Sequence, residues 1–151
     1  MKRILVFLLV SILLLPLLIT GCASSKEAAS PTPTPETQKV EITLDEFAAQ
    51  KSMIKFVETT YPGTVTVRLG SNATTGYGWA VTEIEHASVI EQVSNNYEEP
   101  KDTGLLGAGG TEVWVFNTKD TGLAIIRMSY SQKWEGGEKD TYTLTINVNV
   151  R

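Results

Sequence analysis

The segment from Tyr142 to Val150 alternates strictly between apolar and polar side chains. A period of two residues predicts a β-strand with one face in a protein core and the other in water. Six other runs are rich in β-branched or aromatic residues and also predict strands. These runs are 40–44, 64–69, 79–84, 89–94, 112–117 and 123–130.

The pattern of these runs favours one fold class. Runs 112–117 and 123–130 are apolar on both faces and are joined by a turn-forming segment at 119–122, which predicts a hairpin in the interior of a sheet. A helical stripe of apolar residues occurs at 45–56, and it is weak. Short strands with Gly-rich or Asn-rich connections predict an all-β fold, an antiparallel β-sandwich of about seven strands, in preference to an α/β fold.

The N-terminus has the pattern of an export signal. An almost unbroken apolar stretch at 4–19 follows two basic residues, and it is shorter than the roughly 20 residues of a membrane span. The tetrad Ile-Thr-Gly-Cys at 19–22 resembles the lipobox of prokaryotic lipoproteins, in which cleavage precedes a cysteine that receives a diacylglycerol. We therefore expect a lipoprotein signal peptide at residues 1–21 and lipidation of Cys22, with an ordinary secretory signal as the alternative.

The next segment is a candidate tether. Residues 22–38 are rich in Ser, Ala, Glu and alternating Pro and Thr, a composition that buries little apolar area and favours polyproline II. We expect this stretch to be a lipidated, disordered linker and residues 39–151 to form one domain. Because two or more acyl chains anchor a protein firmly, we expect an exported protein held on a cell-envelope membrane, with its domain outside the cytoplasm.

Charge and residue types argue against several functions. Removing Lys2 and Arg3 with the signal leaves 11 basic against 17 acidic residues, a net charge of −6 with His86 neutral. This balance disfavours nucleic-acid binding, which requires clustered cations. Cys22 is the sole cysteine, so the domain cannot form a disulfide, and with His86 as the sole histidine a catalytic triad or a metal-ligand cluster is disfavoured. We expect no enzymatic activity, no metal and no cofactor.

Three connections are longer and more particular than a sandwich requires. The first loop covers 71–78, with the sequence Ser-Asn-Ala-Thr-Thr-Gly-Tyr-Gly. Asn72 can fold its amide onto the main chain, Thr74 and Thr75 present short, stiff side chains, and the glycines permit positive φ. This composition predicts a slender and rigid loop.

The second loop covers 104–110 and is rich in glycine. Glycines allow the backbone to approach another surface closely. A phosphate-binding loop is the alternative, but the segment lacks the Lys-Ser/Thr continuation and leads into a predicted strand instead of a helix.

The third loop covers 131–138 and connects two predicted strands. Trp134 lies in it beside Lys133, Glu135 and two glycines, which predicts an indole at a loop tip. An exposed aromatic anchor is typical of binding surfaces. The alternative is an indole that covers the end of the sandwich.

These loops resemble those of the chagasin family of cysteine-protease inhibitors, in order and approximate spacing. That family carries an Asn-Pro-Thr-Thr-Gly-aromatic loop followed by Trp, a Gly-x-Gly-Gly loop and an Arg-Pro-aromatic loop. The matching segments here are Asn72-Ala73-Thr74-Thr75-Gly76-Tyr77-Gly78-Trp79, Gly107-Ala108-Gly109-Gly110 and Gln132-Lys133-Trp134. The third segment departs from the Arg-Pro pattern, and Ala73 replaces a proline, which removes a fixed φ from the first loop.

The resemblance covers about 40–151 and implies an immunoglobulin-like sandwich with all three loops at one end. It implies a monomeric, reversible inhibitor of papain-family cysteine proteases that occludes the active-site cleft. The residues that would contact the protease are Asn72, Ala73, Thr74, Thr75, Gly76, Tyr77, Gly107, Ala108, Gly109, Gly110, Gln132, Lys133 and Trp134. The alternative is an immunoglobulin-like surface lipoprotein that uses these loops for adhesion or envelope interaction, because this fold serves many functions.

Overall fold

The computed structural model of the chain describes residues 34–100 and 107–151. The predicted signal peptide, the lipidation site Cys22, most of the predicted linker and the first three residues of the second loop lie outside the described residues. Within the described ranges, no helix has the length and hydropathy of a membrane span.

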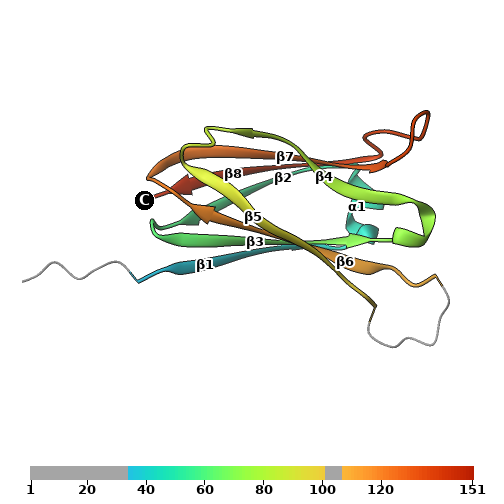
Figure 1. Ribbon diagram of the computed structural model, residues 1–151, viewed down its shortest axis with the longest axis horizontal. Helices are drawn as coiled ribbons and strands as arrows, with labels where there is room; N and C mark the ends of the chain where they lie inside the picture. Colours follow the sequence, from blue (N-terminus) through green and yellow to red (C-terminus); the bar gives the residue numbers. More distant parts are fainter. Residues whose placement is uncertain (1–33, 101–106) are drawn as a thin grey trace, which may run out of the picture. The chain divides into compact units, whose positions relative to one another are not determined.

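Two four-stranded sheets pack face to face in the described part of the chain (Figure 1). The first sheet has the spatial order β1 (Glu36–Ile42), β3 (Gly63–Ser71), β6 (Gly110–Thr118) and β5 (Ile90–Glu98). The second sheet has the order β2 (Ser52–Thr59), β8 (Tyr142–Val150), β7 (Gly122–Gln132) and β4 (Tyr77–Glu85). The predicted all-β, immunoglobulin-like sandwich is confirmed.

The sandwich is antiparallel except at two edge strands. β1 pairs with β3 in parallel, and β2 pairs with β8 in parallel. The chain leaves the first sheet after β1, returns along β2 in the second sheet, and re-enters the first sheet as β3. Because it reverses direction twice, β3 runs in the direction of β1.

The predicted helical segment at 45–56 is only half helical. Helix α1 (Leu44–Gln50) begins at a capping box, in which the Thr43 hydroxyl accepts a bond from Glu46 N at 3.3 Å and the Glu46 carboxylate accepts one from Thr43 N at 2.8 Å. The bond from Thr43 N, together with one from the Thr43 hydroxyl to the same carboxylate, lowers the pKa of Glu46 below its ordinary value. The helix ends at Lys51, whose φ of 61° turns the chain into β2.

About seven strands were predicted, and the described residues contain eight; β2 is the strand that the sequence pattern does not predict. Met53 and Val57 face the core, whereas Ile54 and Phe56 face solvent with 62% and 81% of their surface exposed. Apolar residues on both faces hide the alternation that marks a strand. Hence the sequence pattern predicts only a weak helix there.

The core lies between the sheets and follows the predicted alternation. Leu144, Ile146, Val148 and Val150 of β8 are each at most 2% exposed. They meet buried residues of β3 and β6 in the first sheet, which include Val65, Val67, Leu69 and Phe116. Each such side chain contributes about 1.5–3 kcal/mol when fully buried, so the domain needs no disulfide to hold its sheets together.

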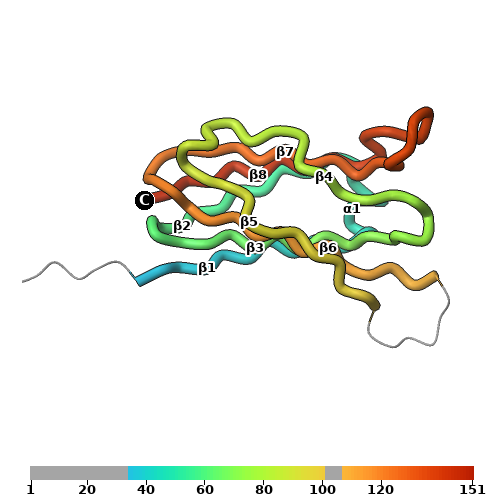
Figure 2. The backbone as a smooth tube through the Cα atoms, viewed as in Figure 1, coloured from blue at the N-terminus to red at the C-terminus, as the bar shows by residue number. Residues whose placement is uncertain are grey.

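The two ends of the sandwich differ, as the backbone trace shows (Figure 2). The first and third loops and helix α1 lie at one end, which we call the loop end (Figure 1). β1 begins at the opposite end, where Glu36 is in register with Gly63, and it starts ahead of residue 39. The C-terminus also lies there, since Arg151 N donates to Thr59 O at 2.9 Å.

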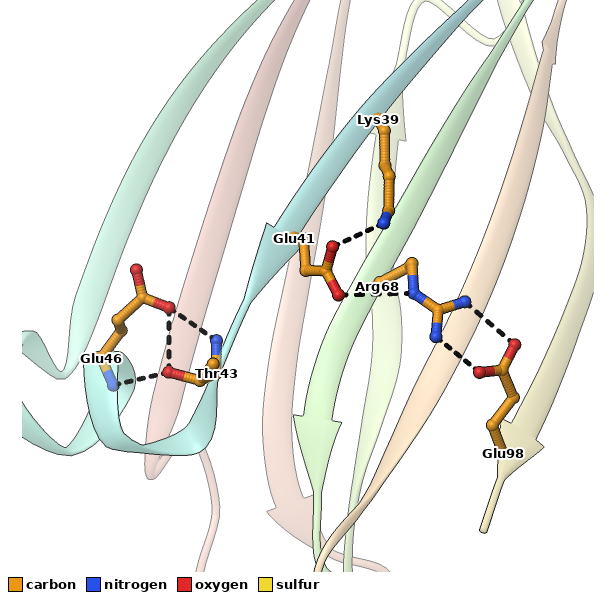
Figure 3. Close-up of polar contacts among 6 residues, drawn as sticks. All are labelled: Lys39, Glu41, Thr43, Glu46, Arg68 and Glu98. Carbon is orange, nitrogen blue, oxygen red and sulfur yellow. Dashed lines mark hydrogen bonds and ion pairs between the residues drawn. The ribbon is translucent and has the colours of Figure 1, made fainter. Parts of the chain in front are cut away.

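Ion pairs cross the outer face of the first sheet (Figure 3). Arg68 on β3 makes a bidentate pair with Glu98 on β5, at 2.9 and 2.5 Å, and its Nε lies 3.6 Å from a carboxylate oxygen of Glu41 on β1. A hydrogen bond from Lys39 lowers the pKa of Glu41 below its ordinary value. Exposed pairs contribute little to stability individually, so we assign them the role of linking β1, β3 and β5 across a wet face.

Two phenylalanines give a matched test of the core. Phe47 of α1 is fully buried against Trp79, at 4.6 Å between ring centroids, whereas Phe56 is 81% exposed. Phe47→Ala should lower the free energy of unfolding by about 3–5 kcal/mol, because it leaves a cavity. Phe56→Ala should change it by less than about 0.5 kcal/mol. Urea unfolding measures both, and equal losses would contradict the assignment of α1 to the core.

Candidate functional site

The first loop is a single turn of 3-10 helix, η1 (Ala73–Thr75), held by Asn72. The Asn72 Oδ1 atom accepts bonds from Thr74 N at 3.2 Å and from Thr74 Oγ1 at 2.6 Å. The Thr75 hydroxyl donates to Asn72 O at 2.6 Å. Gly76 then closes the turn with a φ of 77°, in the left-handed region. The predicted Asx-type turn at Asn72 is confirmed, and every hydroxyl in the turn bonds within the loop.

The described part of the second loop is joined to the first. Asn72 Nδ2 donates to Gly107 O at 3.0 Å, so one side-chain amide bonds both loops. Gly107 is exposed and has a φ of 78°, and a Cβ there would meet Thr74 Oγ1 at an ordinary contact distance of 3.9 Å. A Cβ at Gly110 would instead lie 2.3 Å from Glu98 O and 2.5 Å from the hydroxyl of Tyr97. Gly110 N also donates to that hydroxyl at 3.0 Å. The chain's own packing therefore requires glycine at 110, and Gly107 keeps an accessible backbone.

The third loop is closed by its own hydrogen bonds. Gln132 N donates to Glu138 O at 2.8 Å, and Glu138 N donates to Gln132 Oε1 at 2.9 Å. The Lys139 ammonium donates to Gln132 O at 2.5 Å and to Trp134 O at 2.9 Å. Gly137 N donates to Trp134 O at 3.2 Å and closes the tip. Gln132 thus shapes this loop with its side chain and its main chain.

Trp134 brings the third loop against the first. A Cβ on Gly76 would lie 2.2 Å from Cζ3 and 2.6 Å from Cη2 of the indole, so the ring lies directly over the glycine. Half of the Trp134 surface remains exposed. The side chain therefore does two things, because it covers Gly76 with one part of the ring and presents the rest to solvent.

Lys133 and Tyr77 add further contacts between the first and third loops. The Lys133 side chain lies over Gly78, where a Cβ would come within 2.4 Å of Cε. The Tyr77 hydroxyl donates to Glu138 Oε2 at 2.5 Å, which raises the pKa of Tyr77 and lowers the pKa of Glu138. Glu138 was absent from the predicted site residues, because a glutamate in a polar loop carries no sequence signal of a partner 61 positions away.

A layer of aromatic rings supports the loops from below. The ring of Tyr130 lies 5.3 Å from that of Tyr77, 5.2 Å from that of Trp79 and 5.7 Å from that of Tyr142, between centroids. Its hydroxyl accepts a bond from Asn72 N at 2.9 Å. Tyr130, only 4% exposed, lies in a predicted strand and is not among the predicted site residues. It connects the core of the second sheet to the base of the first loop.

The structure therefore brings the described members of the predicted site together at the loop end. Asn72 contacts the second loop, and Gly76 contacts the third. His86 lies elsewhere, directly after β4 and near the opposite end. Within residues 34–100 and 107–151, no group of three or more His, Cys, Asp or Glu side chains could hold a metal ion.

Comparison with known sequences defines the class of this protein. The sequence matches the chagasin family peptidase inhibitor I42 over residues 62–146. Chagasin of Trypanosoma cruzi is 35% identical to it over 86 residues, which make up 54% of this chain and 76% of chagasin. The chain belongs to the chagasin family, and it is therefore a peptidase inhibitor and not an enzyme.

Solved structures share the fold. The cysteine protease inhibitor EhICP2 from Entamoeba histolytica superposes with a TM-score of 0.62 at 19% identity, over 80% of this chain and 100% of that one. PbICP-C, solved in complex with falcipain-2, superposes with a TM-score of 0.52 at 16% identity, over 77% of this chain and 99% of that one. At these identities the likeness establishes the sandwich fold alone. The contacts that this chain makes are argued from its own residues.

A comparison of alanine variants at Gly76 and Gly136 distinguishes the effect of indole packing on stability from the cost of a positive φ. Their φ angles are 77° and 74°, but a Cβ at Gly136 would meet nothing within 4 Å. Gly136→Ala should cost about 1–2 kcal/mol for the left-handed backbone alone. Gly76→Ala should cost more and should shift the indole N–H resonance of Trp134, because the methyl group displaces the ring. Equal costs and an unmoved resonance would contradict the packing of Trp134 on Gly76.

Proposed function

We propose that the chain is a reversible inhibitor of papain-family cysteine proteases and that its three loops together occlude the active-site cleft. The observation that carries this proposal is the physical coupling of the loops. The Asn72 amide bonds the first loop to the second, and Trp134 packs the third loop on Gly76 of the first. Membership of the chagasin family supports the inhibitory activity. The cysteine protease inhibitor among the structural neighbours supports the class of target.

In this proposal the tip of the first loop enters the cleft. Ala73, Thr74 and Thr75 are the exposed residues of that loop, and their neighbours Asn72 and Gly76 are partly buried. The main chain at Thr74 and Thr75 would lie over the catalytic cysteine and histidine of the protease and exclude substrate sterically. Both hydroxyls already bond to Asn72. The tip therefore enters the cleft without losing side-chain freedom.

The other two loops would contact the walls of the cleft. The exposed part of the Trp134 ring would stack on an apolar surface as the aromatic anchor. On the other side, Gly107 and Ala108 would approach through their backbone, since Gly107 is exposed. Gly109 and Gly110 pack closely on this chain and would hold that backbone in place. Lys133 would add a cation beside the third loop.

Preorganisation would give the affinity. Binding loses less free energy when loops are already ordered in their bound shape. Ala73 lacks the fixed φ of a proline, but the bonds from Thr74 to Asn72 and from Gly76 N to Ala73 O at 3.1 Å hold the same turn. In this view, Asn72 supplies the rigidity that a proline would otherwise provide.

We further propose that the chain is exported, lipidated at Cys22 and active as a monomer held on a membrane. The lipobox-like tetrad at 19–22 supports lipidation. The position of β1 suits a tether, because this strand begins at the end of the sandwich opposite to the loops (Figure 1). A tether that enters there leaves the loop end accessible to a large soluble partner.

Titration of papain and of a cathepsin L-like protease with the chain from residue 23 tests the function. Trp134→Ala should weaken inhibition by about 2 kcal/mol, roughly thirtyfold in the inhibition constant, because the anchor is lost. Thr75→Asp should weaken it as well, because it places a charge in the cleft. Leu123→Ala is the control, since Leu123 is also exposed, at 66%, but lies near the opposite end.

Circular dichroism should show that all variants are folded. A wild-type chain that leaves both proteases active at high excess would refute the proposal and would favour a surface-binding lipoprotein without inhibitory activity. If wild type inhibits but both loop variants inhibit equally well, the assigned surface is wrong.

A further inference from the structure

A buried carboxylate lies beneath the first loop. Glu112 on β6 is only 6% exposed, and it is the only acidic side chain among the buried residues of the described ranges. It lies two residues after the end of the second loop in the sequence. Burying an ionised carboxylate is unfavourable unless hydrogen bonds compensate for the lost water. A carboxylate in this position therefore requires donors, and the structure supplies two.

One oxygen of Glu112 joins the two stems of the first loop. Its Oε1 atom accepts a bond from Ser71 Oγ at 2.7 Å and a bond from Trp79 N at 3.0 Å. Ser71 is the last residue of β3 and the first residue of the loop, and Trp79 directly follows the loop in β4. Both donors are buried, at 1% and 2% exposure. The oxygen thus bridges Ser71 at the start of the loop and Trp79 directly after its end.

These bonds connect the two sheets at the point where the chain passes from one to the other. β3 belongs to the first sheet and β4 to the second, so no ladder of backbone bonds links them. The same oxygen also lies close to the last loop residue, since a Cβ on Gly78 would be 3.4 Å from it. Glu112 consequently fixes the distance between the stems without reaching the loop's exposed tip.

We propose that Glu112 is a positioning residue for inhibition: through Ser71 and Trp79 it sets the spacing and direction of the first loop's stems, so that Thr74 and Thr75 are presented to the protease. This inference rests on the proposed function. Glu112 does not touch the protease, because it is buried beneath the loop. Since one oxygen receives both bonds, an amide oxygen at the same place can do the same work.

Four variants of the chain from residue 23 test the role against papain. Glu112→Ala removes both bonds and should raise the inhibition constant by about tenfold or more. Glu112→Gln keeps an accepting oxygen and should stay within about threefold of wild type. Ser71→Ala removes one bond and should have an intermediate effect, which keeps the test available if Glu112→Ala does not fold.

Thr118→Val is the matched control at the opposite end. The Thr118 hydroxyl is also buried and accepts a bond from Gly63 N at 2.7 Å. This variant should lower the melting temperature and leave the inhibition constant unchanged. Hydrogen exchange adds a readout that does not depend on inhibition. The amides of Thr75 and Gly76, which bond within the loop, should exchange faster in Glu112→Ala and as in wild type in Thr118→Val.

The outcomes separate the two proposals. If wild type does not inhibit, the proposed function fails, and the exchange rates alone decide whether Glu112 orders the loop. If wild type inhibits and Glu112→Ala inhibits equally well, the positioning role is overturned. It is also overturned if Thr118→Val weakens inhibition to the same extent for the same drop in melting temperature, or if Glu112→Gln loses as much as Glu112→Ala.

Discussion

The side-chain amide of Asn72 is the contact on which the loop end depends. Its oxygen holds the 3-10 turn through Thr74, and its nitrogen holds the carbonyl of Gly107 in the second loop. An amide is suited to this position because it accepts at one atom and donates at the other. A carboxylate at the same place could hold the turn but could not donate to the second loop. One residue therefore holds the first loop in its turn and also bonds it to the second loop.

The base beneath this contact is built by the sandwich itself. Tyr130 stacks among aromatic rings of the second sheet and holds the main chain of Asn72 through its hydroxyl. Glu112, from the first sheet, bonds Ser71 and Trp79 on either side of the loop. The loop is thus attached to both sheets. A rigid scaffold that carries binding residues on loops is a common arrangement. Here the attachments are buried hydrogen bonds, and their loss would change the position of the loop tip.

The sequence predicted the parts of this structure that depend on local pattern. Strict alternation in Tyr142–Val150 identified a core strand, and the residues of the first loop identified the turn at Asn72. Strand β2 was missed because Ile54 and Phe56 are apolar yet face solvent. Local pattern cannot separate such a strand from a weak helix.

The features of the loop end that the sequence does not predict are contacts between segments far apart in the chain. The glycine at 110 is required by the carbonyl of Glu98 and the hydroxyl of Tyr97, which would both clash with a Cβ there. The bond between Tyr77 and Glu138 and the packing of Trp134 on Gly76 join positions far apart in the chain. None of these contacts leaves a periodic signature. They follow only once the strand order has brought the three loops to one end.

Occlusion of the active-site cleft is tested most directly by a binding measurement on two forms of papain. One form has a free cleft, and the other has its catalytic cysteine covalently blocked by a peptide-like inhibitor that fills the cleft. Calorimetric titration with the chain from residue 23 should give tight binding to the free form and a loss of at least about two orders of magnitude on the blocked form, because both occupants need the same space. Equal affinity for the two forms would contradict the account.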